Sequence, residues 1–126
     1  MQIKLYKVNK LNETIKNIIG NKDYKMDVVT KFHMLGILKA FETPLMNIET
    51  IRNEKIVEYG TSDENGNVQI DQNDSETFSK FVADMNVLLN TDVDIDIVPL
   101  NAETVCDLGL SSDELIVLYD IMELNS

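Results

Sequence analysis

The chain has 126 residues, a hydrophobic content of 44% and a formal net charge of −11, from 22 acidic and 11 basic residues. This length predicts a single domain whose core needs neither disulfides nor metal to fold. The negative charge argues against direct binding to nucleic acid or to anionic membranes, because both would repel the protein.

The single cysteine, Cys106, excludes an internal disulfide and a cysteine-based zinc site. The first residues lack the apolar region of a secretory signal, and no later window approaches the length of a membrane span. We therefore expect a protein of the cytoplasm. A partner that is steered by electrostatic attraction should be basic.

The N-terminal stretch begins with a short alternation of apolar residues, which predicts either an edge strand or the entry to a helix: Ile3, Leu5 and Val8. From Leu11 to Ile19 the apolar spacing is helical. Gly20 and Asn21 are expected to end this helix as a left-handed cap, and residues 22 to 25 to connect it to the next one.

Residues 23 to 59 form the longest run, with one glycine and one proline. Their apolar positions recur at spacings of three and four, apart from a gap filled by Arg52, and predict one covered stripe along a helix: Val28, Phe32, Leu35, Leu38, Phe41, Leu45, Ile48, Ile56 and Tyr59. At Pro44 the helix either restarts with Thr43 as its N-cap or continues with a kink. A kink or short break is favoured over a wide turn, because the helical spacing of the apolar residues continues from Phe41 to Leu45 and Ile48.

Residues 61 to 75 have the composition of an acidic loop, with a turn signal at Asn65-Gly66 and a candidate short strand at residues 68 to 70. The acidic residues do not fit a calcium-binding EF-hand, because Gly66 is the fourth residue from Asp63 and the EF-hand needs glycine at the sixth. Apolar residues at helical spacing then predict a helix over residues 76 to 89, opened by Asp74 or Ser75.

Residues 93 to 98 alternate between aliphatic and acidic side chains, which predicts a strand that Pro99 ends. Its aliphatic face should cover the helices, and its partner should be residues 68 to 70 or residues 2 to 5. Three carboxylates should share the other face: Asp92, Asp94 and Asp96. They would lie ~6.6 Å apart, close to the spacing of phosphates on extended nucleic acid, so the row could occupy a basic groove in place of DNA or RNA. Alternatively, it only discourages edge-to-edge aggregation.

Residues 101 to 110 give mixed signals. Ser111 and Glu114 then satisfy the capping-box rule and open a helix over residues 115 to 124 that is apolar around most of its circumference. Such a helix is usually buried on more than one side, so we expect a homo-oligomer or a partner to cover what the domain leaves exposed.

The residues with chemical potential are few. His33 is the only histidine, and Cys106 has acidic neighbours and no nearby cation to favour its thiolate. No glycine-rich phosphate loop occurs. We therefore expect no catalytic residue, no metal site and no cofactor. An enzyme would need an unrecognised carboxylate site among four residues: Asp63, Glu64, Asp71 and Asp74.

The order of these features resembles a family of small uncharacterised proteins of phages and prophages in Gram-positive bacteria. The resemblance rests on five segments in sequence: Glu58-Tyr59-Gly60, residues 63 to 67, Leu88-Leu89-Asn90, residues 93 to 96 and the Leu-rich helix after Ser111 to Leu115. It implies a phage or prophage origin, with the cytoplasm being that of the host bacterium, and a mostly helical fold. It supplies no activity.

The expected fold class is mainly α (α+β): a long helical hairpin, kinked or straight at Pro44, packed with two further helices and a small two- or three-stranded β element. The domain should span residues 1 to 126, with a helical part over residues 9 to 60, the acidic loop over 61 to 75 and a helix-strand-helix part over 76 to 126.

The expected function is non-enzymatic binding of a host or phage protein. One alternative is an acidic anti-defence inhibitor that mimics nucleic acid and blocks a host system such as CRISPR, and another is a phage assembly factor. The candidate partner-binding residues are Asp92, Asp94, Asp96, Asp63 and Glu64.

Overall fold

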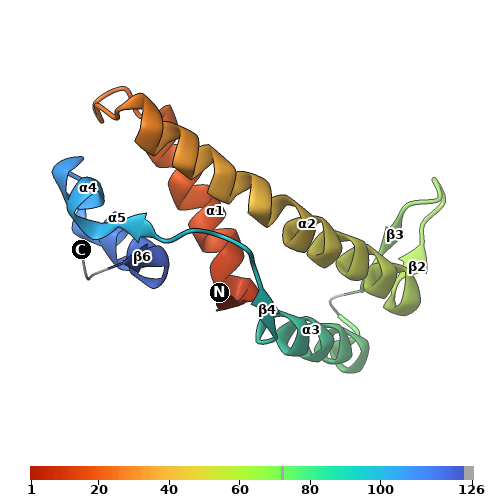
Figure 1. Ribbon diagram of the computed structural model, residues 1–126. Coiled ribbons are helices and arrows are strands. Elements are labelled where there is room, and N and C mark those ends of the chain that lie inside the picture. The colour runs from red at the N-terminus through yellow and green to blue at the C-terminus, as the bar shows by residue number, and fades with distance from the viewer. Residues whose placement is uncertain (72, 124–126) are drawn as a thin grey trace.

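The computed structural model describes residues 1 to 71 and 73 to 123. Two helices, α1 (Leu5–Gly20) and α2 (Val28–Tyr59), lie side by side as a helical hairpin (Figure 1). Helix α3 (Ser75–Leu89) packs along the C-terminal half of α2. At the other end, α5 (Ser112–Leu118) packs on α1, with α4 (Ala102–Asp107) beside it (Figure 1). The prediction of a mainly helical fold with a small β element is confirmed.

The described strands form three separate two-stranded sheets. Strand β1 (Gln2–Lys4) pairs antiparallel with β4 (Asp92–Asp94), with Ile3 opposite Val93. Strands β2 (Thr61–Ser62) and β3 (Val68–Gln69) form a hairpin, and β5 (Leu100–Asn101) pairs parallel with β6 (Met122–Glu123). Of the two expected partners for the acidic strand, the N-terminal segment is correct and residues 68 to 70 are wrong. The strand is also shorter than predicted.

Helix α2 is continuous through Pro44. It begins after Asp27, whose carboxylate accepts a hydrogen bond of 2.6 Å from the Thr30 backbone N–H. Thr43 is therefore not an N-cap and the helix does not restart there, so of the two alternatives the continuous helix is correct. Phe41 is fully buried and Leu45 packs against the core, so tertiary contacts on either side of the proline support the helix across it.

The core lies at one end of the molecule. Its buried apolar side chains come from two parts of the chain: Ile3, Leu5, Val8, Leu11, Ile15, Ile18, Met34, Ile37 and Phe41, then Ile95, Leu100, Val105, Leu110, Leu118 and Ile121. No described residue from 42 to 94 is buried. We call the C-terminal half of α2, the β2–β3 hairpin and α3 together the α3 arm. Half-buried side chains and polar contacts hold it, such as the 2.7 Å hydrogen bond that the Tyr59 hydroxyl donates to Asp84.

The predicted stripe on α2 is wrong over the first half of the helix. Val28 and Phe32 are 83% and 79% exposed, whereas Met34 and Ile37 are 0% and 2% exposed. Successive residues turn by about 100°, so the buried pair lies on the side opposite to the exposed pair. This part of α2 is apolar on both sides, and spacing alone does not decide which side faces the core.

Several helix ends also differ from the predictions. Helix α1 begins at Leu5 and includes Gly20, and Asn21 has a φ of −87°, so the expected left-handed cap is wrong. Left-handed backbone occurs at Gly66 in the β2–β3 turn, as its turn signal predicts, and at Gly109. Residues 102 to 107 form a helix, α4, that the mixed signals did not predict.

The final helix is shorter than predicted, because α5 ends at Leu118 and a 3₁₀ turn (Tyr119–Ile121) follows. Residue 124 lies outside the described residues. Leu118 and Ile121 are buried, and Ile116 is exposed at 70%. Leu118 and Ile121 are thus covered by the domain itself, whereas Ile116 and Tyr119 stay exposed, and self-association stays a prediction.

The capping box at the start of α5 is confirmed. The Glu114 carboxylate accepts hydrogen bonds from the Ser111 backbone N–H at 3.0 Å and from the Tyr24 hydroxyl at 2.5 Å. Partial burial alone would raise the pKa of Glu114, but the hydrogen bonds from Tyr24 and Ser111 outweigh it and hold this pKa below its usual range. The same contact raises the pKa of the Tyr24 hydroxyl. It joins the α1–α2 connection to α5.

Because the pKa of Glu114 is lowered by folding, its hydrogen bonds stabilise the native state above the unfolded pKa and are lost as the pH falls through the folded one. We expect Glu114→Gln to lower the melting temperature at pH 7, and this deficit to shrink below about pH 4, near the unfolded pKa. Thermal melts of both proteins at pH 7 and in acid would measure it. A deficit that does not change with pH would contradict the assignment.

Candidate functional site

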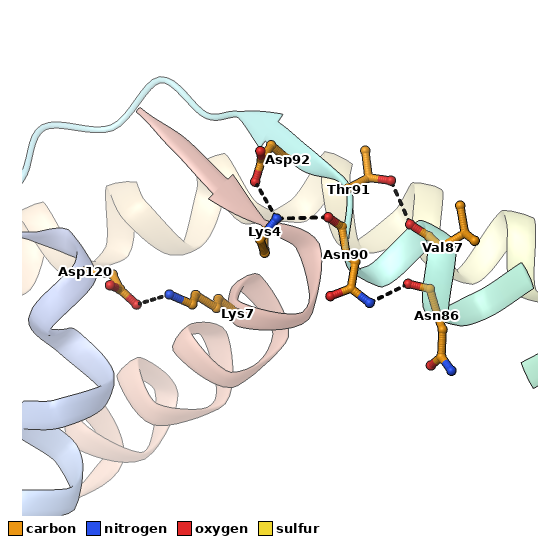
Figure 2. Close-up of polar contacts among 8 residues, drawn as sticks. All are labelled: Lys4, Lys7, Asn86, Val87, Asn90, Thr91, Asp92 and Asp120. Carbon is orange, nitrogen blue, oxygen red and sulfur yellow. Dashed lines mark hydrogen bonds and ion pairs between the residues drawn. The ribbon is translucent and has the colours of Figure 1, made fainter. Parts of the chain in front are cut away.

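The predicted row of carboxylates lies at the junction of β1, β4 and the end of α3. The Lys4 ammonium donates hydrogen bonds to the Asn90 carbonyl at 3.1 Å and to Asp92 at 3.3 Å (Figure 2). The Met1 amine lies 3.1 Å from Asp94. Asp96 is exposed, beyond the end of β4. The predicted alternation is confirmed, but cations lie against two of the three carboxylates and weaken the row as an array of negative charge.

The two other candidate residues, Asp63 and Glu64, lie in the β2–β3 hairpin. Asp63 accepts hydrogen bonds from the backbone N–H groups of Asn65 at 2.8 Å and Asn67 at 2.9 Å, so it stabilises the turn. The hairpin projects beyond the far end of α2, whereas β4 lies beside the N-terminus (Figure 1). The structure therefore does not bring the predicted residues into one site, and their binding role stays a prediction.

The carboxylates of the alternative enzymatic site also have local roles. Asp71 accepts a hydrogen bond from the Asn73 backbone N–H at 2.9 Å. Asp74 caps α3, and its pKa is lowered by hydrogen bonds from the backbone and the hydroxyl of Thr77. Within residues 1 to 71 and 73 to 123, no three His, Cys, Asp or Glu side chains are close enough to hold a metal ion. Cys106 is exposed.

His33 ties the connection between β4 and β5 to α2. Its Nε2 atom lies 2.7 Å from the Val98 carbonyl oxygen, a distance at which a protonated Nε2 donates a hydrogen bond. Between the two segments lies an open groove of about 440 Å³, and its walls are mainly apolar: Val29, Phe32, His33, Gly36 and Ile37 from α2, with Asp96, Ile97 and Val98 opposite.

Around this groove lies an exposed apolar surface that we call the α2 patch. Its members and their exposed fractions are Val28 (83%), Val29 (74%), Phe32 (79%), Leu35 (48%) and Val98 (70%). Gly36 lies among them. In the part of the chain that the structure describes, no atom outside its chain neighbours and the backbone of its own helix comes within 4 Å of the place where its side chain would begin. Contiguous apolar surface of this kind usually marks a binding site, whereas single exposed apolar residues do not.

The sequence did contain a signal for the α2 patch. Apolar residues occupy both faces of α2 over residues 28 to 41, and only one face can cover the core of a small domain. Neither the choice of face nor the contribution of Val98 follows from spacing, because both depend on how β4 leads the chain back across α2.

Charge is divided unevenly along the chain. Residues 1 to 39 carry eight lysines and three acidic residues, a net charge of +5, whereas residues 40 to 126 carry three basic and 19 acidic residues, a net charge of −16. On the side of the patch nearer α1, a second hollow of about 510 Å³ contains Lys16 and Lys39 together with Leu35. Lys16 and Lys39 therefore border the patch on this side, together with Glu42, whereas Asp96 borders it on the groove side.

No protein-family model, curated protein or solved structure matches this chain. The resemblance to phage and prophage proteins therefore stays a prediction. Within the described residues, no helix combines the length and the apolar character that crossing a lipid bilayer requires.

Proposed function

We propose that this protein acts by binding another protein at the α2 patch, without catalysis. The observation that carries the proposal is the exposure of Val28, Val29 and Phe32, 74% or more each, on a helix whose opposite face is buried. Such side chains in water lose the free energy that burial would supply, about 25 cal/mol for each Å². Aromatic anchors beside a groove are the usual centres of protein interfaces.

The polar residues support a non-enzymatic role. Asp63, Asp71 and Asp74 bond to turns and to a helix cap, and His33 to the Val98 carbonyl. Catalytic groups instead converge on one space, where a base and a nucleophile reach the same substrate. A phage or prophage origin, with a host or phage protein as the partner, remains part of this proposal.

The test is a comparison of three tagged proteins used to capture partners from a bacterial lysate, with and without phage infection. They are the wild type, the double variant Val29→Ser with Phe32→Ser, and the control Val57→Ser, which changes a 65% exposed residue on the same helix but outside the patch. We expect a protein retained by the wild type and the control to be lost with the double variant.

Once purified, the retained protein should bind the wild type and the Val57→Ser control with similar affinity and the double variant more weakly. All three proteins should melt at similar temperatures, because exposed side chains contribute little to stability. Retention of the same proteins by all three would overturn the proposal.

A second candidate is the acidic inhibitor of a nucleic-acid-binding system. The observation that favours it is the concentration of 19 of the 22 acidic residues after residue 39. The same capture experiment separates the two candidates if Asp94→Lys with Asp96→Lys is added. A partner lost with this variant at low salt, and kept by the Phe32 variant, would favour the acidic surface.

A further inference from the structure

We infer that the α2 patch receives an amphipathic helix of the partner, with acidic residues along the edge of that helix that faces α1. The inference rests on the proposed function, since it names the partner's chemistry at the same surface. Three features of the patch carry it: the spacing of its apolar residues, the open space at Gly36 and the lysines beside it.

The spacing of the exposed residues suits a helical partner. Val28, Phe32 and Leu35 follow one another at intervals of four and three. This is the spacing with which side chains of one helix interlock with those of another. The groove against Val98 continues the apolar surface along one side of the row.

Gly36 supplies the close approach that such packing needs. A glycine inside a helix destabilises it relative to alanine, so it usually has a structural reason. Among the described residues none is found, because apart from its chain neighbours and the backbone of its own helix nothing lies within 4 Å of the position of its missing Cβ atom. A partner helix lying over Gly36 would gain from the missing side chain, because its backbone could come closer.

The charged residues beside the exposed apolar residues of α2 determine which partner helix can bind. Lys16 and Lys39 line the hollow on the α1 side, and Lys31 lies one helical turn from both Val28 and Leu35. Among the described residues, Lys16 and Lys31 form no ion pair, and Lys39 pairs only with Glu42 on its own helix, at 3.2 Å. On the opposite side, Asp96 lines the groove. Acidic residues of the partner should therefore lie on one edge only.

A second copy of this chain fits less well. Two α2 patches facing each other would bring Lys31 and Lys39 of both copies into one interface, and like charges at close range oppose association. A separate acidic helix has no such conflict. It would also be attracted to the basic part of the surface before contact.

The test uses three synthetic peptides of about 15 residues, roughly four helical turns. The first is a cross-linked amphipathic helix with glutamates along one edge, and the second is its twin with lysines there. The third has the composition of the first, arranged with apolar residues at every second position, so that it favours an extended strand. Their affinities for the full-length protein are measured by fluorescence anisotropy at low and at moderate salt.

We expect the glutamate-edged helix to bind about tenfold more tightly than its lysine twin at low salt, from several pairs of partly exposed charges. The ratio should fall with salt. In the double variant Lys31→Glu with Lys39→Glu, the lysine-edged helix should bind more tightly than the glutamate-edged one. Gly36→Leu should abolish binding of both helices while circular dichroism shows an intact fold, and Val57→Ser should leave binding unchanged.

Three results would overturn the inference. They are equal affinity of the two helical peptides, tighter binding of the strand-patterned peptide, and a wild-type dimer in sedimentation equilibrium that Phe32→Ser dissociates. If a partner in the capture experiment depends on the patch and the peptides show no preference, the inference fails and the proposed function stands. If capture does not depend on the patch, the proposed function fails.

Discussion

Replacing Phe41 by alanine is expected to lower the free energy of unfolding by about 3–5 kcal/mol, whereas Phe32→Ala should change it by no more than about 0.5 kcal/mol. The two residues belong to the same helix, but Phe41 is 0% exposed and Phe32 is 79% exposed. The first substitution removes a ring from the packed core and leaves a cavity, and the second removes a ring from water. Urea unfolding followed by circular dichroism would measure both changes.

This pair tests which face of α2 is inside, because both substitutions remove the same ring and have the same helix propensity. The predicted single stripe would require similar losses for both, since Phe32 and Phe41 were expected on the same buried side. Similar losses would therefore contradict the orientation of α2 in the structure.

The second large effect is expected at Gly60, the residue that ends α2. A Cβ atom there would lie 2.8 Å from a Val68 methyl carbon and 2.9 Å from the Gln69 carbonyl oxygen, and it would collide with the Ile56 carbonyl oxygen. Gly60→Ala should therefore cost about 1–3 kcal/mol through displacement of β3. Gly36→Ala, in open space within a helix, should instead stabilise the protein by about 0.5–1 kcal/mol.

Both substitutions replace glycine by alanine. A loss of stability at residue 60 and a gain at residue 36 would therefore separate the effect of steric packing from that of backbone entropy. Urea unfolding gives the two free energies, and proton exchange of the Val68 and Gln69 amides reports on the β2–β3 hairpin itself. A Gly60→Ala protein as stable as the wild type would show that the hairpin is not held against α2 as described.

The parts of the fold that depend on near neighbours could be read from the sequence. Asp74 and Ser111 accept hydrogen bonds from residues three positions later, so their caps are visible in a few letters of sequence. Asn65-Gly66 marks its turn for the same reason. The pairing of residues 2 to 4 with residues 92 to 94 is different, since two acceptable partners existed and only the complete core selects one.

The candidate site was harder to predict than the fold. The exposure of Phe32 depends on which face of α2 the α1 helix and the β4–β5 connection cover. Two of the three strand carboxylates were located on the correct face, but the cations beside them, Lys4 and the Met1 amine, come from the other end of the chain. Spacing gives the direction of a side chain, and tertiary neighbours decide what it meets there.

The pairing of Ile3 with Val93, ninety positions later, also affects the order of assembly. On the ribosome, the first strand must wait until α2, the hairpin and α3 have all been synthesised before its partner emerges. Closing so long a loop is entropically costly and slows folding. Strand β1 therefore stays unpaired through most of translation, whereas α1 can pack on α2 as soon as that helix has been synthesised.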